Sequence, residues 1–214
     1  AVVKFYDGYS GMVMKGTLKA IGVSDTPIVF TALNDDEYGG DTNNNDGQNS
    51  ATPGSWLGIS FQNDATNLSE LSHTVLRYGG NLLGDSFGAA IRADRINISL
   101  NNSIVEKNNN NGLWLTNSSS IIDSVWFTEH MTTGAPQNPE DGKGIYVQGG
   151  SPEIRNSYIW NNYYGLYIDN WWDPNNMISV VANILFSNNS FGGNVFDIWD
   201  VNNPPPPPPP PPGP

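Results

Sequence analysis

The densest group of potential metal ligands lies in one acidic segment near the N-terminus, Asn34–Gly47. Within it, Asp41, Asn43 and Asn45 alternate with other residues, as in the opening of a calcium-binding loop. Carboxylate and amide oxygens are ligands that Ca²⁺ prefers. Gly47 comes one residue later than such a loop requires and no bidentate glutamate follows, so a solvated acidic turn is the alternative. The candidate ligands are Asp35, Asp36, Asp41, Asn43, Asn45 and Asp46.

Acid–base chemistry has few candidates outside this segment. A glycoside hydrolase needs paired carboxylates, and a polysaccharide lyase needs an arginine or lysine base beside an acidic cluster. The sequence offers Arg92 near Asp94, and it places Asp123 and Glu153 at similar positions of adjacent repeats. Neither arrangement recurs along the chain, and we interpret each of the two histidines as structural or solvent-facing, not as a ligand or a base. The sequence therefore predicts a protein that is not an enzyme.

Aromatic residues give a clearer indication of function. If Leu113 and Leu115 point into a core, strand alternation directs Trp114 outward, and likewise Tyr146 and Tyr167 on the next two repeats. This predicts an external column of three rings. Exposed aromatic groups mark contact surfaces, so we predict a site for a partner or a glycan, unless inserted loops fold over the rings. The residues of this predicted site are Trp114, Tyr146, Tyr167, Tyr158, Trp160, Trp171 and Trp172.

A repeated segment carries these side chains. A small residue followed by the pattern apolar, any, apolar begins at Gly58, Ala90, Gly112, Gly144 and Gly165, at spacings of 32, 22, 32 and 21 residues. The alternation has a period of two and not the 3.6 of a helix. The sequence therefore predicts an all-β fold, a parallel β-helix of about 21–22 residues per coil. Loops are inserted near 79–87, 131–141 and 171–176.

A second strand pattern follows each copy of the first. Its copies are Leu71–Leu76, Leu100–Val105, Ile121–Trp126, Ile154–Ile159 and Val180–Leu185. In this alignment Trp126 matches the inward Ile159, so this coil either buries a tryptophan or has a shifted register. Asparagine recurs after this strand at Asn108, Asn162 and Asn188, which indicates either an amide ladder along the axis or the abundance of Asn in turns.

The chain ends on nine consecutive prolines, Pro204–Pro212, followed by Gly213 and Pro214. Because proline fixes φ near −65°, this run predicts a polyproline II segment. We therefore divide the chain into a β-helix domain, 1–203, and a polyproline tail, 204–214. Such a tail is either a rigid spacer or a ligand for grooves of Trp and Tyr. We predict that the tail binds aromatic residues of a second copy through positions such as Pro204, Pro208 and Pro212.

Composition narrows the class of partner. The net charge is −12 with only nine Lys and Arg, which argues against nucleic acid and against anionic membrane surfaces. No apolar run approaches the length of a membrane span, so membrane insertion is not expected. With 14% charged residues and 37% hydrophobic ones, the chain is too apolar for an acidic disordered segment. Cysteine is absent, which does not determine the compartment.

The first third of the chain resembles a known family. The resemblance is carried, in order, by Val2–Phe5, Gly16–Ala20, Pro27–Thr31, Asp35–Gly47, Trp56–Phe61 and Leu71–Gly80. These segments are similar to the right-handed parallel β-helix repeat modules of large secreted bacterial and archaeal surface proteins, in the pectate-lyase-like superfamily. The resemblance implies a right-handed coil, an extracellular location and an acidic loop that often looks calcium-like. Most such modules have no assigned chemistry.

Both ends of the repeat lack a capping element. In the family, a segment like Val2–Phe5 usually follows an earlier turn and a cap, and here Gly193–Ile198 begins a further coil. We therefore expect either a fragment of a longer protein or ends that neighbouring copies cover. The first function predicted is an extracellular structural protein, a self-assembling filament or surface-layer subunit. The alternative is a polysaccharide-binding or adhesin module, and a polysaccharide lyase or hydrolase comes third.

Overall fold

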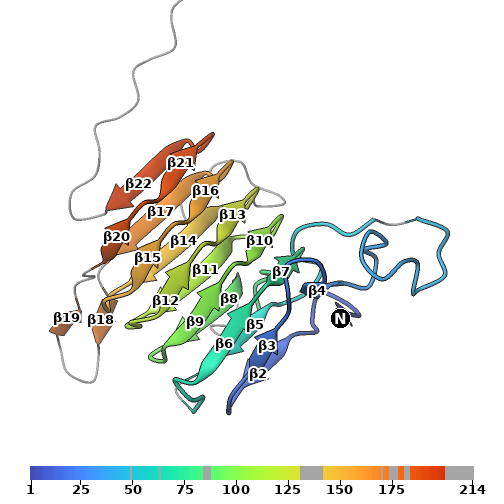
Figure 1. The fold of residues 1–214 in the computed structure, drawn as a ribbon, viewed down its shortest axis with the longest axis horizontal. Coiled ribbons are helices and arrows are strands. Elements are labelled where there is room, and N and C mark those ends of the chain that lie inside the picture. The colour runs from blue at the N-terminus through green and yellow to red at the C-terminus, as the bar shows by residue number, and fades with distance from the viewer. Residues whose placement is uncertain are drawn as a thin grey trace, which may run out of the picture.

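The described part of the chain is all-β. The computed structural model describes residues 1–48, 50–62, 64–83, 88–130, 142–169, 171–173, 178–180 and 184–200. Within these ranges there are strands but no helix, and therefore no helix that could cross a membrane. The strands lie in three parallel sheets, and successive coils stack along one axis, as Figure 1 shows. This arrangement is compatible with the β-helix solenoid predicted from the repeat.

Each full coil adds one strand to each of three sheets, which we call A, B and C. Sheet A contains β1 (Val2–Phe5), β4 (Ile28–Ala32), β7 (Thr74–Arg77), β10 (Ile104–Glu106), β13 (Trp126–Thr128), β16 (Tyr158–Trp160) and β21 (Ser190–Gly192). Sheet B contains β2 (Met12–Met14), β5 (Ile59–Phe61), β8 (Ala89–Asp94), β11 (Asn111–Thr116), β14 (Lys143–Gln148), β17 (Tyr164–Asp169) and β22 (Phe196–Asp200).

Sheet C contains β3 (Lys19–Ile21), β6 (Ser69–Ser72), β9 (Ile98–Asn101), β12 (Ile121–Asp123), β15 (Glu153–Arg155) and β20 (Leu185–Ser187). Two further strands, β18 (Trp171–Asp173) and β19 (Ile178–Val180), pair antiparallel with each other outside the three sheets. The predicted insertion near 171–176 therefore holds part of a short hairpin.

The core is a set of aligned apolar columns inside the coil. On sheet B, Leu113 pairs in register with Ile91 and Ile145, and all three are fully buried. The small residue that opens each repeat allows neighbouring coils to approach, because a Cβ added at Gly144 would lie 2.7 Å from the carbonyl oxygen of Gly165. The repeat pattern thus encodes both the core column and the close coil spacing.

The turns between sheets use left-handed backbone at equivalent positions. From β6 onward, each described corner from sheet C to sheet A contains one residue with positive φ, and φ lies between 46° and 59°. These residues are His73, Asn102, Ser124, Asn156 and Asn188. Asparagine tolerates this conformation better than most residues because its short polar side chain bonds locally. Asn188 therefore belongs to this corner and not to the ladder that the sequence suggested.

An asparagine ladder lies at the other end of the sheet A strands. Asn108 accepts a hydrogen bond from the backbone N–H of Gly79 (2.7 Å) and donates to the carbonyl oxygen of Leu76 (3.1 Å). Asn162 makes the equivalent bonds in a later coil, where it accepts from the backbone N–H of His130 (3.0 Å) and donates to the carbonyl oxygen of Phe127 (3.2 Å). The third member is Asn194, not Asn188, and its amide binds the backbone of the Asn162 coil.

Two predicted alignments were resolved by the register of the strands. Trp126 pairs with Tyr158 and points outward, while the adjacent Phe127 pairs with Ile159 in the core. Of the two alternatives, the shifted register is therefore correct. The predicted last copy of the second pattern, Val180–Leu185, was wrong: Phe186 of β20 pairs with Ile154, because the inserted hairpin displaces the strand along the sequence.

Candidate functional site

The aromatic column predicted from strand alternation is present on the outer face of sheet B. Trp114, Tyr146 and Tyr167 pair in register on β11, β14 and β17. The rings of Trp114 and Tyr146 stack with centroids 5.2 Å apart, and Tyr167 meets Tyr146 edge-on at 5.3 Å. Trp199 continues this register on β22, a position that the sequence interpretation missed.

The faces and polar atoms of this column already have partners. The guanidinium of Arg92 lies 4.1 Å from the ring centroid of Trp114, on the neighbouring coil. The indole N–H of Trp114 donates to Gln148 Oε1 at 3.1 Å, and the hydroxyl of Tyr146 donates to Asp169 Oδ2 at 3.3 Å. The column is therefore a packed ladder rather than a row of open rings.

A groove of about 440 Å³ runs beside the column. Its lining combines the three rings of the column with polar side chains from the same and neighbouring strands: Asn110, Asn111, Lys143, Gln148 and Asp169. The ammonium group of Lys143 is buried and lies 5.1 and 4.9 Å from the ring centroids of Tyr146 and Tyr167. The groove thus offers donors and acceptors beside an aromatic wall.

One acceptor of this lining lacks a hydrogen bond. The Asn111 side chain is 4% exposed and its Nδ2 donates to the carbonyl oxygen of Gly88 at 2.7 Å. Its Oδ1 has no partner among the described residues. A buried amide oxygen without a donor is costly, so this atom is suited to accept a bond from a bound group. Nearby, burial raises the pKa of Tyr164 to about 12, so this phenol stays neutral.

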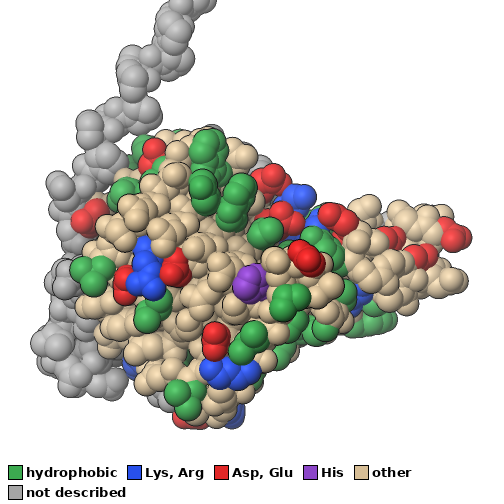
Figure 2. Space-filling model, in the orientation of Figure 1, with side chains coloured by type: hydrophobic (Ala, Val, Ile, Leu, Met, Phe, Trp, Pro, Cys, Tyr) green, Lys and Arg blue, Asp and Glu red, His purple; other side chains and the backbone are tan. Residues whose placement is uncertain are grey.

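A second row of apolar side chains lies on the outer face of sheet A and is open to solvent. It consists of Ile104, Trp126, Tyr158 and Trp160, which we call the sheet A strip. The exposed fractions are 38%, 52%, 42% and 43% respectively. Figure 2 shows this row of hydrophobic side chains over β10, β13 and β16. A hollow of about 380 Å³ adjoins the strip and shares Ile104 and Trp126 with it.

The other end of sheet A is covered by the acidic loop. Arg77 on β7 is 2% exposed and forms ion pairs with Glu37 (2.7 Å), Glu106 (3.2 Å) and Asp35 (3.4 Å). Although burial opposes the charged form, the hydrogen bond to Glu37 and the neighbouring carboxylates hold the pKa of Arg77 above its usual value. Burial raises the pKa of Glu106, whereas the hydrogen bond from Arg77 lowers the pKa of Glu37.

The predicted calcium ligands do not gather around one point through their carboxylates. Asp35 is buried beside Arg77 and accepts a hydrogen bond from the Thr31 hydroxyl at 2.5 Å. Asp41 accepts backbone N–H bonds from Asn45 and Asp46, and the bond from Asn45 is the main cause of its lowered pKa. Within the described ranges, no three His, Cys, Asp or Glu residues gather in a geometry suited to a metal.

Two oxygens of the same loop have no hydrogen-bond partner among the described residues. They are Asp36 Oδ1 and Asn43 Oδ1, both buried atoms, while Asn43 Nδ2 donates to Asn34 Oδ1 at 2.7 Å. The loop therefore contains some unsatisfied acceptors, but its most buried carboxylate has an arginine as its cation. Calcium binding by this loop stays a prediction.

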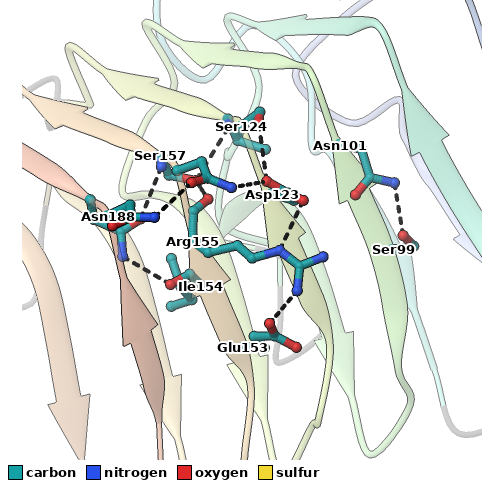
Figure 3. Close-up of polar contacts among 12 residues, drawn as sticks. Ser99, Asn101, Asp123, Ser124, Glu153, Ile154, Arg155, Ser157 and Asn188 are labelled. Carbon is teal, nitrogen blue, oxygen red and sulfur yellow. Dashed lines mark hydrogen bonds and ion pairs between the residues drawn. The ribbon is translucent and has the colours of Figure 1, made fainter.

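The carboxylates considered for acid–base chemistry form an ion-pair cluster on the outer face of sheet C, shown in Figure 3. Arg155 Nε lies 2.9 Å from Asp123 Oδ2, and Arg155 also pairs with Glu153. Hydrogen bonds from Asn156 and Arg155 hold the pKa of Asp123 below its usual value. A carboxyl kept ionised in this way is a poor general acid. Asp94, the carboxylate considered beside Arg92, forms an ion pair with Arg95 at 3.2 Å.

The remaining predicted positions lie outside the residues whose side chains are described. These are Trp171 and Trp172, of which only the strand pairing is known, and the tail residues Pro204, Pro208 and Pro212. No family model, no curated protein and no solved structure matches this chain. The case for any function therefore depends on the residues themselves.

Proposed function

We propose that this chain is a non-catalytic extracellular β-helix module that binds a polysaccharide in the sheet B groove. The observation that carries the proposal is the convergence of Lys143, Gln148, Asp169 and the unpartnered Asn111 Oδ1 beside one aromatic wall. Sugar hydroxyls both donate and accept hydrogen bonds, so they suit a lining that mixes amide, ammonium and carboxylate groups.

The direction of the groove also supports a polymeric ligand. Its aromatic wall follows the register of β11, β14 and β17, and it therefore runs along the axis of the coil. A chain of sugars lying along that axis would meet the same kinds of side chain on successive coils. A small ligand would use only one of these repeated positions.

The proposal includes the type of coil, the location of the protein and its lack of catalysis. The three stacked parallel sheets support a parallel β-helix. We propose, from the resemblance of the first third of the chain, that the coil is right-handed and of the kind in secreted prokaryotic surface proteins of the pectate-lyase-like superfamily. Low charge content and the abundance of Asn at exposed corners support an extracellular location. The pairing of both Asp123 and Glu153 with Arg155 supports a binding role over hydrolysis.

The proposal is tested by electrophoresis of the full chain in gels that contain single polysaccharides, both neutral and acidic. We expect at least one polysaccharide to retard the wild type. Gln148→Ala and Asp169→Asn should each weaken that binding by about tenfold, since each removes one polar contact in the groove. The charge-matched control is Glu70→Gln, which removes one carboxylate from sheet C, where Glu70 pairs with Lys19.

Retardation that the groove variants leave unchanged would contradict the location of the site. Failure of a broad set of polysaccharides to retard the wild type would contradict the function. Because Gln148 and Asp169 also accept hydrogen bonds from Trp114 and Tyr146, thermal unfolding of each variant is measured alongside, and binding is compared at a temperature at which all three variants are folded.

A second function, end-to-end assembly of copies into a filament, is favoured by the end strands. Within the described residues, β1, β2 and β3 each have one neighbour in their sheet, as do β20, β21 and β22. Side chains on these strands are apolar and exposed, for example Val2, Leu185 and Ile198. Such edges accept a further strand. We expect electron microscopy to show filaments that Ile198→Lys abolishes, and separate wild-type particles at high concentration would contradict this function.

A further inference from the structure

We propose that the sheet A strip binds the polyproline tail, Pro204–Pro212, of a second copy of this chain. This inference does not depend on the polysaccharide site, which lies on a different sheet. It also differs from end-to-end stacking, because it joins a side face of one copy to the tail of another.

The strip presents hydrogen-bond donors on an apolar surface. Within the described part of the chain, the indole N–H groups of Trp126 and Trp160 and the hydroxyl of Tyr158 form no hydrogen bond. These three residues are 52%, 43% and 42% exposed respectively, so solvent reaches all of them. A polyproline segment has carbonyl acceptors and no N–H donors, so its backbone complements such a surface. Aromatic-lined grooves recognise proline-rich segments in this way.

The spacings of the two partners agree. Ile104, Trp126 and Tyr158 follow one another on consecutive strands, which lie about 4.8 Å apart in a sheet. Two such steps cover about 9.6 Å. One turn of polyproline II takes three residues of about 3.1 Å each, or about 9.3 Å. Prolines on one side of the segment would therefore meet every second coil along the strip.

Neighbouring surface features favour this occupant. The hollow beside the strip is lined in part by Pro27, Val75, Ile104 and Trp126, and its volume of about 380 Å³ leaves room for proline rings. The whole chain carries a net charge of −12, so two copies repel each other through most surfaces. The nine prolines are uncharged, and a contact made through them avoids that repulsion.

The tail of the same copy is poorly placed for this contact. Along the chain each coil passes from sheet A to sheet B and then to sheet C, and the last described strand, β22, belongs to sheet B. Only three residues, 201–203, precede the first proline, and they span about 10 Å at most. To follow the strip axially, the same tail would first have to pass across the sheet C side. A second copy has no such constraint.

The structure also explains why the strip is favoured over the sheet B column that the sequence suggested for the tail. The ring of Trp114 is flanked by Arg92 and Tyr146, and its N–H is bonded to Gln148. A polyproline segment would find few free donors there, whereas the donors of the strip are open.

The test uses two variants of the full chain and sedimentation velocity over a wide concentration range. The strip variant carries Trp126→Ser and Trp160→Ser, and the tail variant has all nine prolines replaced by serine. We expect the wild type to associate, and each variant alone to raise the dissociation constant by about tenfold or more. A mixture of the two variants should form a one-to-one complex, because one supplies a tail and the other a strip.

A matched control removes two exposed aromatic side chains elsewhere, Tyr6→Ser and Tyr9→Ser, and should associate like the wild type. A monomeric wild type, or a tail variant that assembles as the wild type does, would overturn the proposal. If the strip variant loses polysaccharide binding but keeps its assembly, the strip binds sugar instead. Filaments that survive in the tail variant would show end-to-end assembly without this contact.

Discussion

Two rows of aromatic side chains run along the axis of the β-helix, one on sheet B and one on sheet A. They differ in the groups that surround each ring. In the sheet B column, Arg92 covers one face of Trp114 and Tyr146 covers the other. In the sheet A strip, Trp126 and Tyr158 contact each other at 4.9 Å but leave 52% and 42% of their surfaces exposed. An outward position in the strand pattern is therefore not the same as an open surface.

Sheet A shows the same contrast within itself. Over β4 and β7 nearly every side chain is buried on both faces, because the loop after β4 lies against the outer one. From β10 onward the outer residues are exposed or half-exposed. Arg77 lies at the boundary between the covered and the exposed parts of sheet A. It pairs with Asp35 and Glu37 of the loop and with Glu106 on β10.

The largest loss of stability is expected when the ion pairs between the acidic loop and sheet A are removed. Arg77→Met leaves Asp35, which is 4% exposed, without a countercharge, so unfolding should become easier by about 3–5 kcal/mol. Chemical denaturation measures the change. The double variant Arg77→Met with Asp35→Ala should recover much of the loss, because it removes the stranded carboxylate. A single variant as stable as the wild type would show that the ion pairs do not hold the loop.

The second effect is a dependence of stability on pH, and it comes from His130. This residue follows β13 and occupies the position in the asparagine ladder between Asn108 and Asn162. Its Nδ1 accepts a bond from the Asn108 N–H at 3.3 Å, but its Nε2 has no hydrogen-bond partner in the described structure. Burial lowers the pKa of His130 to about 3, which the Val105 carbonyl opposes only in part. The folded protein therefore contains a neutral imidazole.

The unfolded chain takes up a proton on this histidine near pH 6.5, and the folded chain does so only near pH 3. Stability is thus greatest above pH 6.5 and falls as the pH drops through this window. The loss reaches about 3 kcal/mol at pH 4. Thermal unfolding at several pH values should show this slope, and His130→Asn should remove its share while restoring the ladder. An identical slope in that variant would assign the pH dependence to other groups.

The smallest effects compare the two rows directly. Tyr146→Ala removes contacts with Trp114, Tyr167 and Lys143, and should cost about 2 kcal/mol. Tyr158→Ala on the strip should cost less, about 1 kcal/mol, because 42% of its surface is already exposed in the folded protein. Denaturant midpoints of the two variants give the comparison. Equal losses would mean that the strip is as much a part of the packed fold as the column.

Much of the site came from local periodicity alone. Alternation placed Trp114, Tyr146 and Tyr167 in one outward column, and the structure has them in register. What alternation could not supply was the set of neighbours. Lys143 shares β14 with Tyr146 but also meets the ring of Tyr167 on the next coil, and Asp169 of β17 accepts a hydrogen bond from Tyr146 on the preceding coil. No spacing within one repeat encodes these contacts between coils.

By itself, the sequence determined the coil. Its period-two segments, recurring at 21 or 22 residues with a small residue at each start, predict stacked parallel strands, because only that arrangement buries every repeat in the same way. Where two adjacent apolar residues left the register ambiguous, the tertiary structure determined it. Ile121 and Ile122 can both begin the pattern, and only the pairing of Ile122 with Ile154 turns Trp126 outward.

The tertiary structure also determined which charged groups form pairs and which aromatic side chains stay exposed. The acidic loop looked like a cation site because its ligands are close in sequence, yet the cation beside Asp35 is the guanidinium of Arg77, which is 42 residues away along the chain. The strip stays open because no described loop of its own coils returns over it. Such outcomes depend on groups that are distant in sequence and adjacent in space, and local patterns carry no record of them.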